Sequence, residues 1–212
     1  MINKFKYVPP KIFQRLFIKT IWVSRVNKIL LTFDDGPNPE TTPKILKKLS
    51  EHSIKAIFFC VGENVEKYPE IARQIVSEGH SIANHTYSHS DINFFAKNVN
   101  ELISNCSNVI EDAIGEPPKF FRPPHGRIGI RTEKIVAKFY LTNIMWSLLT
   151  YDYKNNFNIV SFAVEKYLKN NSIIVLHDSL KSKSIIEQSI DLIVAESKEK
   201  GFEIGESSEC LS

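Results

Sequence analysis

Short, unbroken apolar runs alternate along this chain with longer segments whose apolar residues recur at helical spacing. The unbroken runs predict strands buried on both faces, and the periodic segments predict amphipathic helices. We expect strands at 29–31, 56–61, 80–84, 141–146 and 172–176, with a weaker one around Phe202. We expect helices that begin near Pro43 and Tyr68, and further helices at 98–114, 133–140, 157–168 and 184–198.

This alternation of strand and helix predicts parallel strands joined by helical crossovers. A closed barrel, a distorted or incomplete (β/α) barrel with outer helices, and an open doubly wound sheet all satisfy that order. The positions of the polar motifs favour the barrel, because four of them come after different predicted strands and Arg122 comes after the apolar pair Phe120-Phe121. These motifs are Asp34-Asp35, His85, Arg122, Asp152 and His177. The carboxyl ends of the strands of a parallel barrel face one mouth, so five distant segments would meet there.

Two adjacent carboxylates, Asp34 and Asp35, end the first predicted strand, and Gly36-Pro37 follows them. Neighbouring side chains of a strand point to opposite faces, and two carboxylates in one pocket repel each other unless a cation or an arginine separates them. This conflict predicts divided roles, in which one carboxylate binds a metal and the other moves a proton. An ordinary acidic turn is the alternative, because Asp, Gly and Pro are favoured in turns.

Two histidines four residues apart, His85 and His89, follow the third predicted strand. On a helical turn this spacing puts both imidazoles on one side. Together with Asp35 they offer two nitrogens and one oxygen, which is the ligand set of a catalytic zinc with one position open.

Composition excludes several classes of protein. The 212 residues, 42% hydrophobic and 24% charged, are typical of a soluble globular protein with one domain. The net charge of +3 is too small and too evenly spread to indicate nucleic-acid binding. Cys60, Cys106 and Cys210 are widely spaced, which argues against a disulfide framework or a cysteine zinc site and favours a reducing compartment. With only 8 glycines, we find no dinucleotide-binding fingerprint.

Residues 1–28 form a basic and apolar segment, and we expect them to be an extension packed on a domain of residues 29–212. Ile12, Phe13, Leu16 and Phe17 predict one apolar face of a short helix, which docks on a domain more often than it lies on a bilayer. The uncharged stretches are too short for a signal peptide or a membrane span. We therefore expect a cytoplasmic protein, with peripheral membrane contact through residues 1–28 or non-classical export as alternatives.

Four motifs carry a family resemblance: Thr32-Phe33-Asp34-Asp35-Gly36-Pro37, His85-Thr86-Tyr87-Ser88-His89, Arg122-Pro123-Pro124-His125-Gly126 and Leu176-His177-Asp178. In this order the sequence resembles the polysaccharide deacetylase family, also called the NodB homology domain or carbohydrate esterase family four, from about Ile29 to Phe202. The resemblance implies a distorted barrel of parallel strands. It also implies a divalent metal, usually zinc (Zn2+), held by Asp35, His85 and His89.

The resemblance also implies catalytic roles. Asp34 becomes the general base, Arg122 pairs with it, and His177 becomes the general acid that protonates the leaving amine. The main-chain N–H of His125 is expected to stabilise the carbonyl oxygen, at a position where the family often has tyrosine.

A further motif of the family, the fourth in the family's own order, matches less well. In this chain it runs from Trp146 to Tyr153. Leu149 stands where the first of two aspartates is expected, so that His177 is either tuned differently or helped by the second acid, Asp152. We assign substrate contacts to Pro124, Tyr153 and Leu176. Phe94 and Phe95 could line a sugar groove, although aromatic residues in such a position are as often core residues.

The expected activity is the removal of N-acetyl groups from an acetylated sugar by attack of a metal-bound water. The candidate substrates are peptidoglycan, a chitin-like oligosaccharide and a glycan precursor, and we expect a monomer. An O-acetyl ester hydrolase acting on a polysaccharide such as xylan is one alternative. A catalytically silent sugar-binding module on the same fold is the other.

Overall fold

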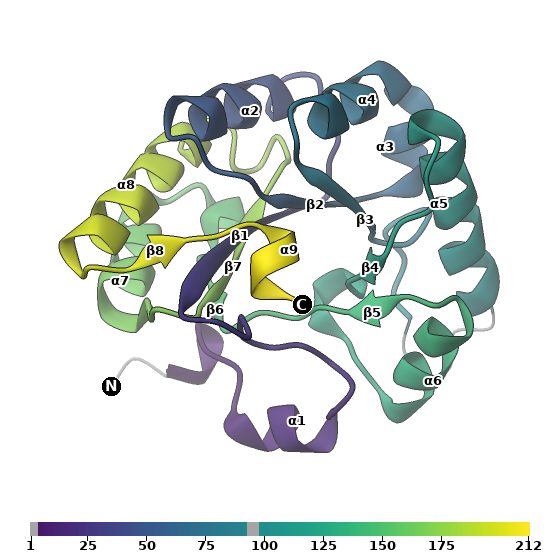
Figure 1. The fold of residues 1–212 in the computed structure, drawn as a ribbon, viewed down its shortest axis with the longest axis horizontal. Helices are drawn as coiled ribbons and strands as arrows, with labels where there is room; N and C mark the ends of the chain where they lie inside the picture. The colour runs from purple at the N-terminus through teal and green to yellow at the C-terminus, as the bar shows by residue number, and fades with distance from the viewer. Residues whose placement is uncertain (1–3, 93–97) are drawn as a thin grey trace.

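The computed structural model describes residues 4–92 and 98–212, and the expected incomplete (β/α) barrel is confirmed. Seven parallel strands form a curled sheet in the order β5-β4-β3-β2-β1-β7-β6, and an eighth strand, β8, pairs with the start of β1. Figure 1 shows helices around the outside of this sheet. Every strand pair is parallel, so the carboxyl ends lie at one end of the barrel.

The strands are β1 (Lys28–Asp34), β2 (Ile57–Cys60), β3 (Ser81–Asn84), β4 (Phe120–Phe121), β5 (Thr142–Asn143), β6 (Leu148–Leu149), β7 (Ile173–His177) and β8 (Glu203–Ile204). The α-helices are α1 (Lys11–Leu16), α2 (Thr42–Glu51), α3 (Gly62–Lys67), α4 (Pro69–Ser77), α5 (Val99–Ile114), α6 (Ile130–Lys138), α7 (Phe157–Tyr167), α8 (Ile186–Glu199) and α9 (Ser207–Cys210). Short 3-10 turns lie at Lys4–Lys6, Pro124–Gly126 and Asp152–Lys154.

The predicted strand at 141–146 is wrong in its length. Only Thr142 and Asn143 form strand β5, and β6 at Leu148–Leu149 was not predicted. The residues between these two strands form hydrogen bonds to other segments. For example, Met145 donates its N–H to the carbonyl of Ile21 in the N-terminal segment (2.8 Å). A two-residue strand has no periodicity, so its position depends on its partners.

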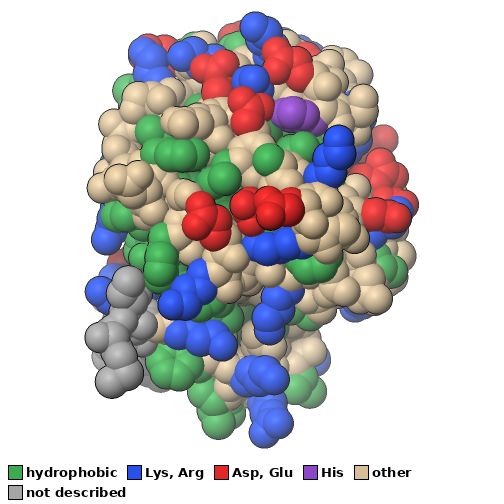
Figure 2. Space-filling view, turned by 90° about the vertical axis from the view of Figure 1, so that its left-hand side faces the viewer, with side chains coloured by type: hydrophobic (Ala, Val, Ile, Leu, Met, Phe, Trp, Pro, Cys, Tyr) green, Lys and Arg blue, Asp and Glu red, His purple; other side chains and the backbone are tan. Residues whose placement is uncertain are grey.

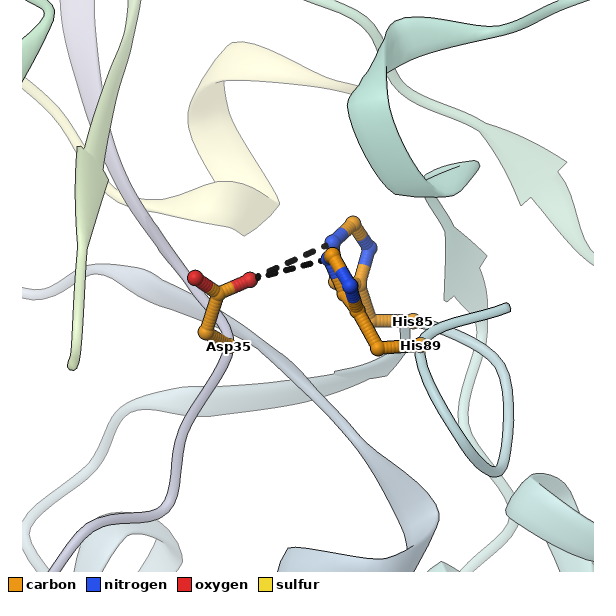
Figure 3. Close-up of side chains that lie close together, drawn as sticks. All are labelled: Asp35, His85 and His89. Carbon is orange, nitrogen blue, oxygen red and sulfur yellow. Dashed lines mark ion pairs between the residues drawn. The ribbon is translucent and has the colours of Figure 1, made fainter. Parts of the chain in front are cut away.

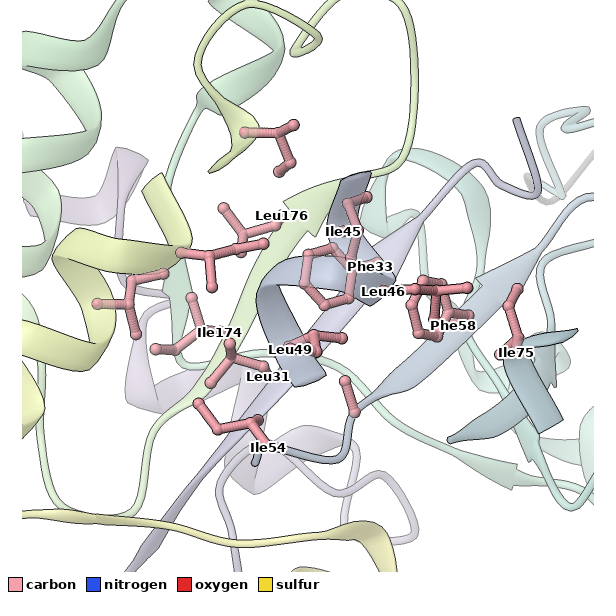
Figure 4. Close-up of a cluster of buried hydrophobic side chains, with 14 of the residues drawn as sticks. Leu31, Phe33, Ile45, Leu46, Leu49, Ile54, Phe58, Ile75, Ile174 and Leu176 are labelled. Atoms are coloured by element: carbon pink, nitrogen blue, oxygen red, sulfur yellow. The ribbon is translucent and has the colours of Figure 1, made fainter. Parts of the chain in front are cut away.

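Strand β1 separates two apolar layers because its side chains alternate between faces. Ile29, Leu31 and Phe33 belong to the main core, which lies between the sheet and helices such as α2 and α8 (Figure 4). Leu30 belongs to a smaller cluster inside the barrel. Thr32 and Asp34 share the side of Leu30, so the proposed catalytic side of β1 is the one that faces into the barrel.

The N-terminal segment lies along the two edge strands of the curled sheet. Ile21 bridges Ile144 after β5, and the N–H of Leu149 in β6 donates to the carbonyl of Tyr7 (2.9 Å). The main-chain N–H of Ser24 donates to the carbonyl of Asn171, just before β7 (3.0 Å). Figure 1 shows α1 at the lower rim of the molecule, below β5 and β6.

Helix α1 forms near the predicted place, but its apolar face is not docked on the domain. Ile12, Phe13 and Leu16 are exposed, and only Phe17, just after the helix, is buried, in a cluster with Trp22 and Met145. In the described residues, no helix is both long enough and apolar enough to cross a bilayer.

The main core predicts a sharp contrast between two helix positions. Leu46 of α2 is fully packed against the sheet, so Leu46→Ala should lower the free energy of unfolding by about 2–5 kcal/mol. Val76 of α4 is exposed, so Val76→Ala should change it by less than about 1 kcal/mol. Urea denaturation of the full chain checks both values, and equal losses would contradict this description of the core.

Candidate active site and metal centre

A cavity of about 260 Å³ lies at the carboxyl ends of the strands. Its walls come from segments far apart in the sequence, as the positions of the polar motifs predicted. The lining residues are Asp34, Asp35, His85, His89, His125, Gly126, Trp146, Leu149, Tyr153, Val175, His177 and Lys181.

Asp34 and Asp35 both line this cavity although they are adjacent in sequence. Asp34 ends β1 with its side chain inside the barrel, and the backbone then leaves the extended conformation at Asp35, whose φ is +80°. A positive φ is unfavourable for a residue other than glycine. A hydrogen bond from the Asn64 side chain to the carbonyl of Asp35 (2.7 Å) helps to hold this bend. The bend thus brings both carboxylates to one side.

Asp35, His85 and His89 lie together as the predicted metal ligands (Figure 3). The Nε2 atoms of His89 and His85 are 3.2 and 3.8 Å from Asp35 Oδ1. The candidate donor atoms of all three residues lie within 4.8 Å of one another. One carboxylate oxygen and two imidazole nitrogens at this spacing fit a divalent ion such as zinc.

The orientation of His85 supports this use. Its Nδ1–H donates to the main-chain carbonyl of Arg122 (2.7 Å), which leaves the Nε2 lone pair directed at Asp35 and His89. This outer hydrogen bond is the usual means of fixing a metal-binding histidine. Burial lowers the pKa of His85 to about 4, although the charges of Asp34 and Asp35 oppose the shift. The ring is therefore neutral near pH 7, as a metal ligand must be.

The two histidines are brought together by a loop and not by the predicted helical turn. Residues 85–89 contain no helix, and Thr86 and His89 have positive φ values of 65° and 53°. The Asn84 side chain accepts a hydrogen bond from the N–H of Thr86 (2.9 Å), which shapes the first part of the loop. The turns of this loop, and not a helix, therefore bring the two imidazoles together across the four-residue spacing.

Burial would raise the pKa of the Asp35 carboxyl, but its surroundings reverse this effect. The hydrogen bond from His89 and the nearby charges of His177 and His85 hold the pKa of Asp35 well below its usual value. Asp35 is therefore an anion among imidazoles, which is the form that binds a cation.

Arg122 is completely buried and pairs with Asp34. Its Nη1 donates to Asp34 Oδ1 (2.6 Å) and to Thr32 Oγ1 (2.8 Å). Nε and Nη2 donate to the carbonyls of Ile144 (2.9 Å) and Met145 (3.1 Å). The guanidinium also lies 4.0 Å from the centre of the Phe59 ring. These contacts fix the carboxylate of Asp34 in one orientation.

Asp152 accepts two hydrogen bonds from His177. Asp152 Oδ1 accepts from His177 Nδ1 (2.7 Å), and Oδ2 accepts from the His177 main-chain N–H (2.7 Å). Burial would lower the pKa of His177, but the charge and hydrogen bond of Asp152 raise it to about 9. Nδ1 is occupied by this bond, so Nε2 is the nitrogen that is available to the cavity. The second acid of the fourth motif is thus the one that contacts this histidine.

Asp178, just after β7, forms hydrogen bonds to the end of β1 and to the loop that follows it. Its two carboxylate oxygens accept from the hydroxyls of Thr41 and Thr42 (2.5 Å each), and its N–H donates to the carbonyl of Asp34 (2.7 Å). A Cβ atom on Gly36 would lie 2.2 Å from Asp178 Oδ2, so only glycine fits there. Burial raises the pKa of Asp178 to about 7, although the two threonine hydrogen bonds oppose this.

Two of the three predicted substrate contacts, Leu176 and Pro124, do not line the cavity. Leu176 lies in the main core because it alternates with Val175 and His177, which face the cavity. Pro124 is buried in the turn that carries His125. Tyr153 does line the cavity, and its ring meets that of His177 edge to face at 4.8 Å.

The predicted oxyanion position, His125, has a φ of 56°. Its half-exposed ring lies edge to face with that of His89, at 4.8 Å between centroids. Phe94 and Phe95 lie outside the described residues.

Sequence reasoning missed several cavity residues. Trp146 lines the cavity, and Lys181 reaches it from the loop after β7. The position of Trp146 at the end of the predicted strand 141–146 was an available signal. Lys181 had none, because a lone lysine in a loop is usually solvated. Leu149, which replaces an expected acid, makes part of the wall apolar.

A family model described as polysaccharide deacetylase matches residues 24–144, which is more than half of the chain. This chain belongs to the polysaccharide deacetylase family. The matched region contains the candidate metal ligands and the paired Asp34 and Arg122. His177 and Asp152 lie beyond it.

Named family members are similar over different lengths. A peptidoglycan-N-acetylglucosamine deacetylase of Bacillus cereus is 45% identical over 132 residues, which are 60% of this chain and 46% of that protein. The chain therefore spans about half the length of that relative. A chitooligosaccharide deacetylase of Bradyrhizobium sp. is 34% identical over 162 residues, which are 74% of this chain and 73% of that one.

Solved structures of the family share the fold. A crystal structure of a peptidoglycan N-acetylglucosamine deacetylase in complex with 4-naphthalen-1-yl-N-oxidanyl-benzamide superposes with a TM-score of 0.86 and 31% identity. The match covers 93% of this chain and 95% of that one.

The site geometry predicts which histidine binds the metal. Removing His89, a candidate ligand, should weaken zinc binding by more than about 100-fold, because the loss of a ligand exceeds the loss of an outer hydrogen-bond partner. His125→Ala is the matched control, since its ring contacts that of His89 without joining the ligand set. Calorimetric titration of chelator-treated protein with zinc chloride measures both. Equal weakening by the two variants would show that the ligand set is wrong.

Proposed function

We propose that this protein is a metal-dependent hydrolase that removes N-acetyl groups from an acetylated glycan. The observation that carries the proposal is one cavity lined by the metal-ligand set Asp35, His85 and His89 and by two further groups, Asp34 and His177, suited to move protons. The named relatives act on peptidoglycan N-acetylglucosamine and on chitooligosaccharides, so we propose a substrate of this class.

Asp35, His85 and His89 would hold a divalent cation, with zinc the first choice for a donor set of one oxygen and two nitrogens. When bound, such an ion supplies Lewis acidity, which lowers the pKa of a water molecule and polarises the acetamide carbonyl. All remaining steps depend on side chains and backbone groups of this chain.

Asp34 is proposed as the general base. It lines the cavity next to Asp35, and Arg122 fixes its carboxylate through the 2.6 Å hydrogen bond to Oδ1. The attacking water gives its proton to Asp34 as its oxygen bonds to the acetyl carbon. A general base must be within hydrogen-bond reach of that water, and a fixed carboxylate meets this requirement without reorganisation.

His177 is proposed as the general acid. An amide nitrogen is a poor leaving group as an anion, so it must receive a proton as the carbon–nitrogen bond breaks. With Nδ1 bonded to Asp152, His177 can deliver the proton from Nε2. The products are acetate and a free amine on the sugar. Negative charge develops on the carbonyl oxygen during the attack. We propose that the main-chain N–H of His125, together with the cation, would stabilise this charge.

The same residues bear on the alternatives. An alkoxide leaves more readily than an amine, so an O-acetyl esterase would have less need of a histidine whose pKa is raised to about 9. A silent sugar-binding module would need neither the buried Arg122–Asp34 pair nor the Asp152–His177 pair. Both observations favour the N-deacetylase.

Metal removal tests the function directly. Chelator-treated protein should release no acetate from acetylated chitooligosaccharides or peptidoglycan, and zinc should restore the release. Asp34→Asn should lower kcat by about 10²- to 10⁴-fold, as expected for the loss of a general base, and should still bind zinc. Undiminished activity in the zinc-free protein, or in Asp34→Asn, would rule out this mechanism.

The Asp152–His177 pair predicts the alkaline limb of the pH profile. The pKa of His177 is raised to about 9, so its protonated form is present below that pH and is lost as the pH rises through it. Activity should fall correspondingly. Asp152→Asn removes the charge that raises the pKa, so the alkaline limb of kcat/KM should move to lower pH. An unchanged alkaline limb in this variant would remove His177 from the role of acid.

A further inference from the structure

A basic apolar patch covers the N-terminal part of the molecule, and the proposed reaction does not use it. We define it by four exposed apolar side chains, Ile12, Phe13, Leu16 and Ile18, and five exposed cations, Lys4, Lys6, Lys11, Arg15 and Lys19. Ile12, Leu16 and Ile18 are 61%, 62% and 82% exposed. Such large aliphatic side chains gathered in one place indicate an interaction surface.

The charge of the patch is unbalanced. The first acidic residue of the sequence is Asp34, so the five cations have no Asp or Glu near them in the chain. Among the described residues, none of the five forms an ion pair. Thr20, just after the patch, donates a hydrogen bond from Oγ1 to the acidic side chain of Glu133 (2.7 Å). The whole chain carries only +3, so the patch concentrates positive charge on an otherwise slightly acidic molecule.

Figure 2 shows the distribution on one face. Lys and Arg side chains and apolar side chains occupy its lower part, where Figure 1 places α1, and the acidic side chains of this view lie above them.

The patch has the arrangement of a helix that lies on a membrane surface. Ile12, Phe13 and Leu16 share one side of α1 at positions i, i+1 and i+4, while Lys11 and Arg15 flank them. An interfacial helix presents this combination, with apolar side chains entering the bilayer and cations meeting the phosphates. Nucleic acid would leave the aliphatic side chains without a partner.

A second cavity, of about 400 Å³, opens beside the patch. Its lining includes Val8, Pro9, Lys4, Lys11 and Lys169, and none of its lining residues is acidic. An apolar hollow bordered by three lysines is complementary to an anionic amphiphile, whose phosphate would meet the lysines.

We propose that the basic apolar patch binds the surface of an anionic phospholipid bilayer. The chain just after α1 is firmly joined to the barrel, because Phe17 and Trp22 pack on Met145 and Ile21 bonds to residues 143 and 145. Trp146 packs against the same cluster and lines the catalytic cavity. The bilayer would therefore attach to the barrel next to a wall of the active site.

Vesicle sedimentation of the purified full chain tests this inference. Vesicles containing phosphatidylglycerol and phosphatidylcholine should carry the protein down at low salt, and pure phosphatidylcholine vesicles should not. Raising the salt should release it, because exposed charges are screened. The double variant Lys11→Glu with Arg15→Glu should bind at least about 25-fold more weakly, since each removed cation near the surface accounts for about fivefold.

Matched controls separate the patch from general surface effects. Phe13→Ser with Leu16→Ser should lose vesicle binding, whereas Tyr140→Ser, which removes a 95% exposed aromatic ring elsewhere, should retain it. Lys198→Glu, on α8, is the charge control. Circular dichroism melting checks that each variant folds.

Three outcomes would overturn the inference. They are no binding to the anionic vesicles at low salt, equal loss with Tyr140→Ser, and a protein dimer in light scattering that the patch variants abolish, because a second copy would then cover the patch. Acetate release from a soluble acetylated chitooligosaccharide should be the same in the patch variants and the parent chain. Failure of membrane binding is thereby distinguished from failure of the proposed reaction.

Discussion

The completely buried guanidinium of Arg122 is the constraint on which the site depends. A charge taken out of water is tolerated only when its partners replace the lost hydration. Here four hydrogen bonds and an aromatic ring do so, and the partners come from β1, from β2 and from the segment after β5. The arginine therefore joins the carboxyl ends of strands that are far apart in the sequence, and it orients Asp34 at the same time. The carbonyl of Arg122 also accepts from His85, so one residue supports both the proposed base and a candidate metal ligand.

The bent backbone of the site is maintained by a second set of buried contacts. Asp35, Thr86, His89 and His125 all have positive φ, and such conformations persist only where the surrounding structure enforces them. Asp178 supplies part of this enforcement at the loop after β1, since it bonds to Thr41 and Thr42 and lies against Gly36. Strain of this kind is typical of functional sites, where it places side chains that regular structure would separate.

The open side of the curled sheet links the catalytic cavity to the N-terminal segment. Strands β5 and β6 are each two residues long, and the chain between them bonds to residues of the N-terminal segment such as Ile21. This edge would otherwise expose unpaired backbone groups, which native proteins cover. Its covering also supports Trp146, so a surface that we propose for lipid contact and a wall of the cavity share one piece of structure.

The main core and most of the site could be predicted from local pattern. Unbroken apolar runs identified β1, β2 and β7, because a strand that is buried on both faces consists mostly of apolar residues. The positions of Asp34, His85, Arg122 and His177 after strands indicated one mouth, because parallel strands end on the same side. The short strands β4 to β6 carry too little pattern to be located, and the position of β5 and β6 follows from their pairing with neighbours.

By itself, the sequence determined the alternation of the longer strands and helices, the family and the residues of the candidate metal site. Only the tertiary structure decided that Leu176 lies in the core while Trp146 and Lys181 line the cavity, and that residues 85–89 turn without forming a helix. It also decided that Asp152 is the acid against His177 and that the apolar face of α1 is exposed. The reason is physical: chemical identity and periodicity are local properties, whereas the direction of a side chain and its burial depend on residues distant in the chain.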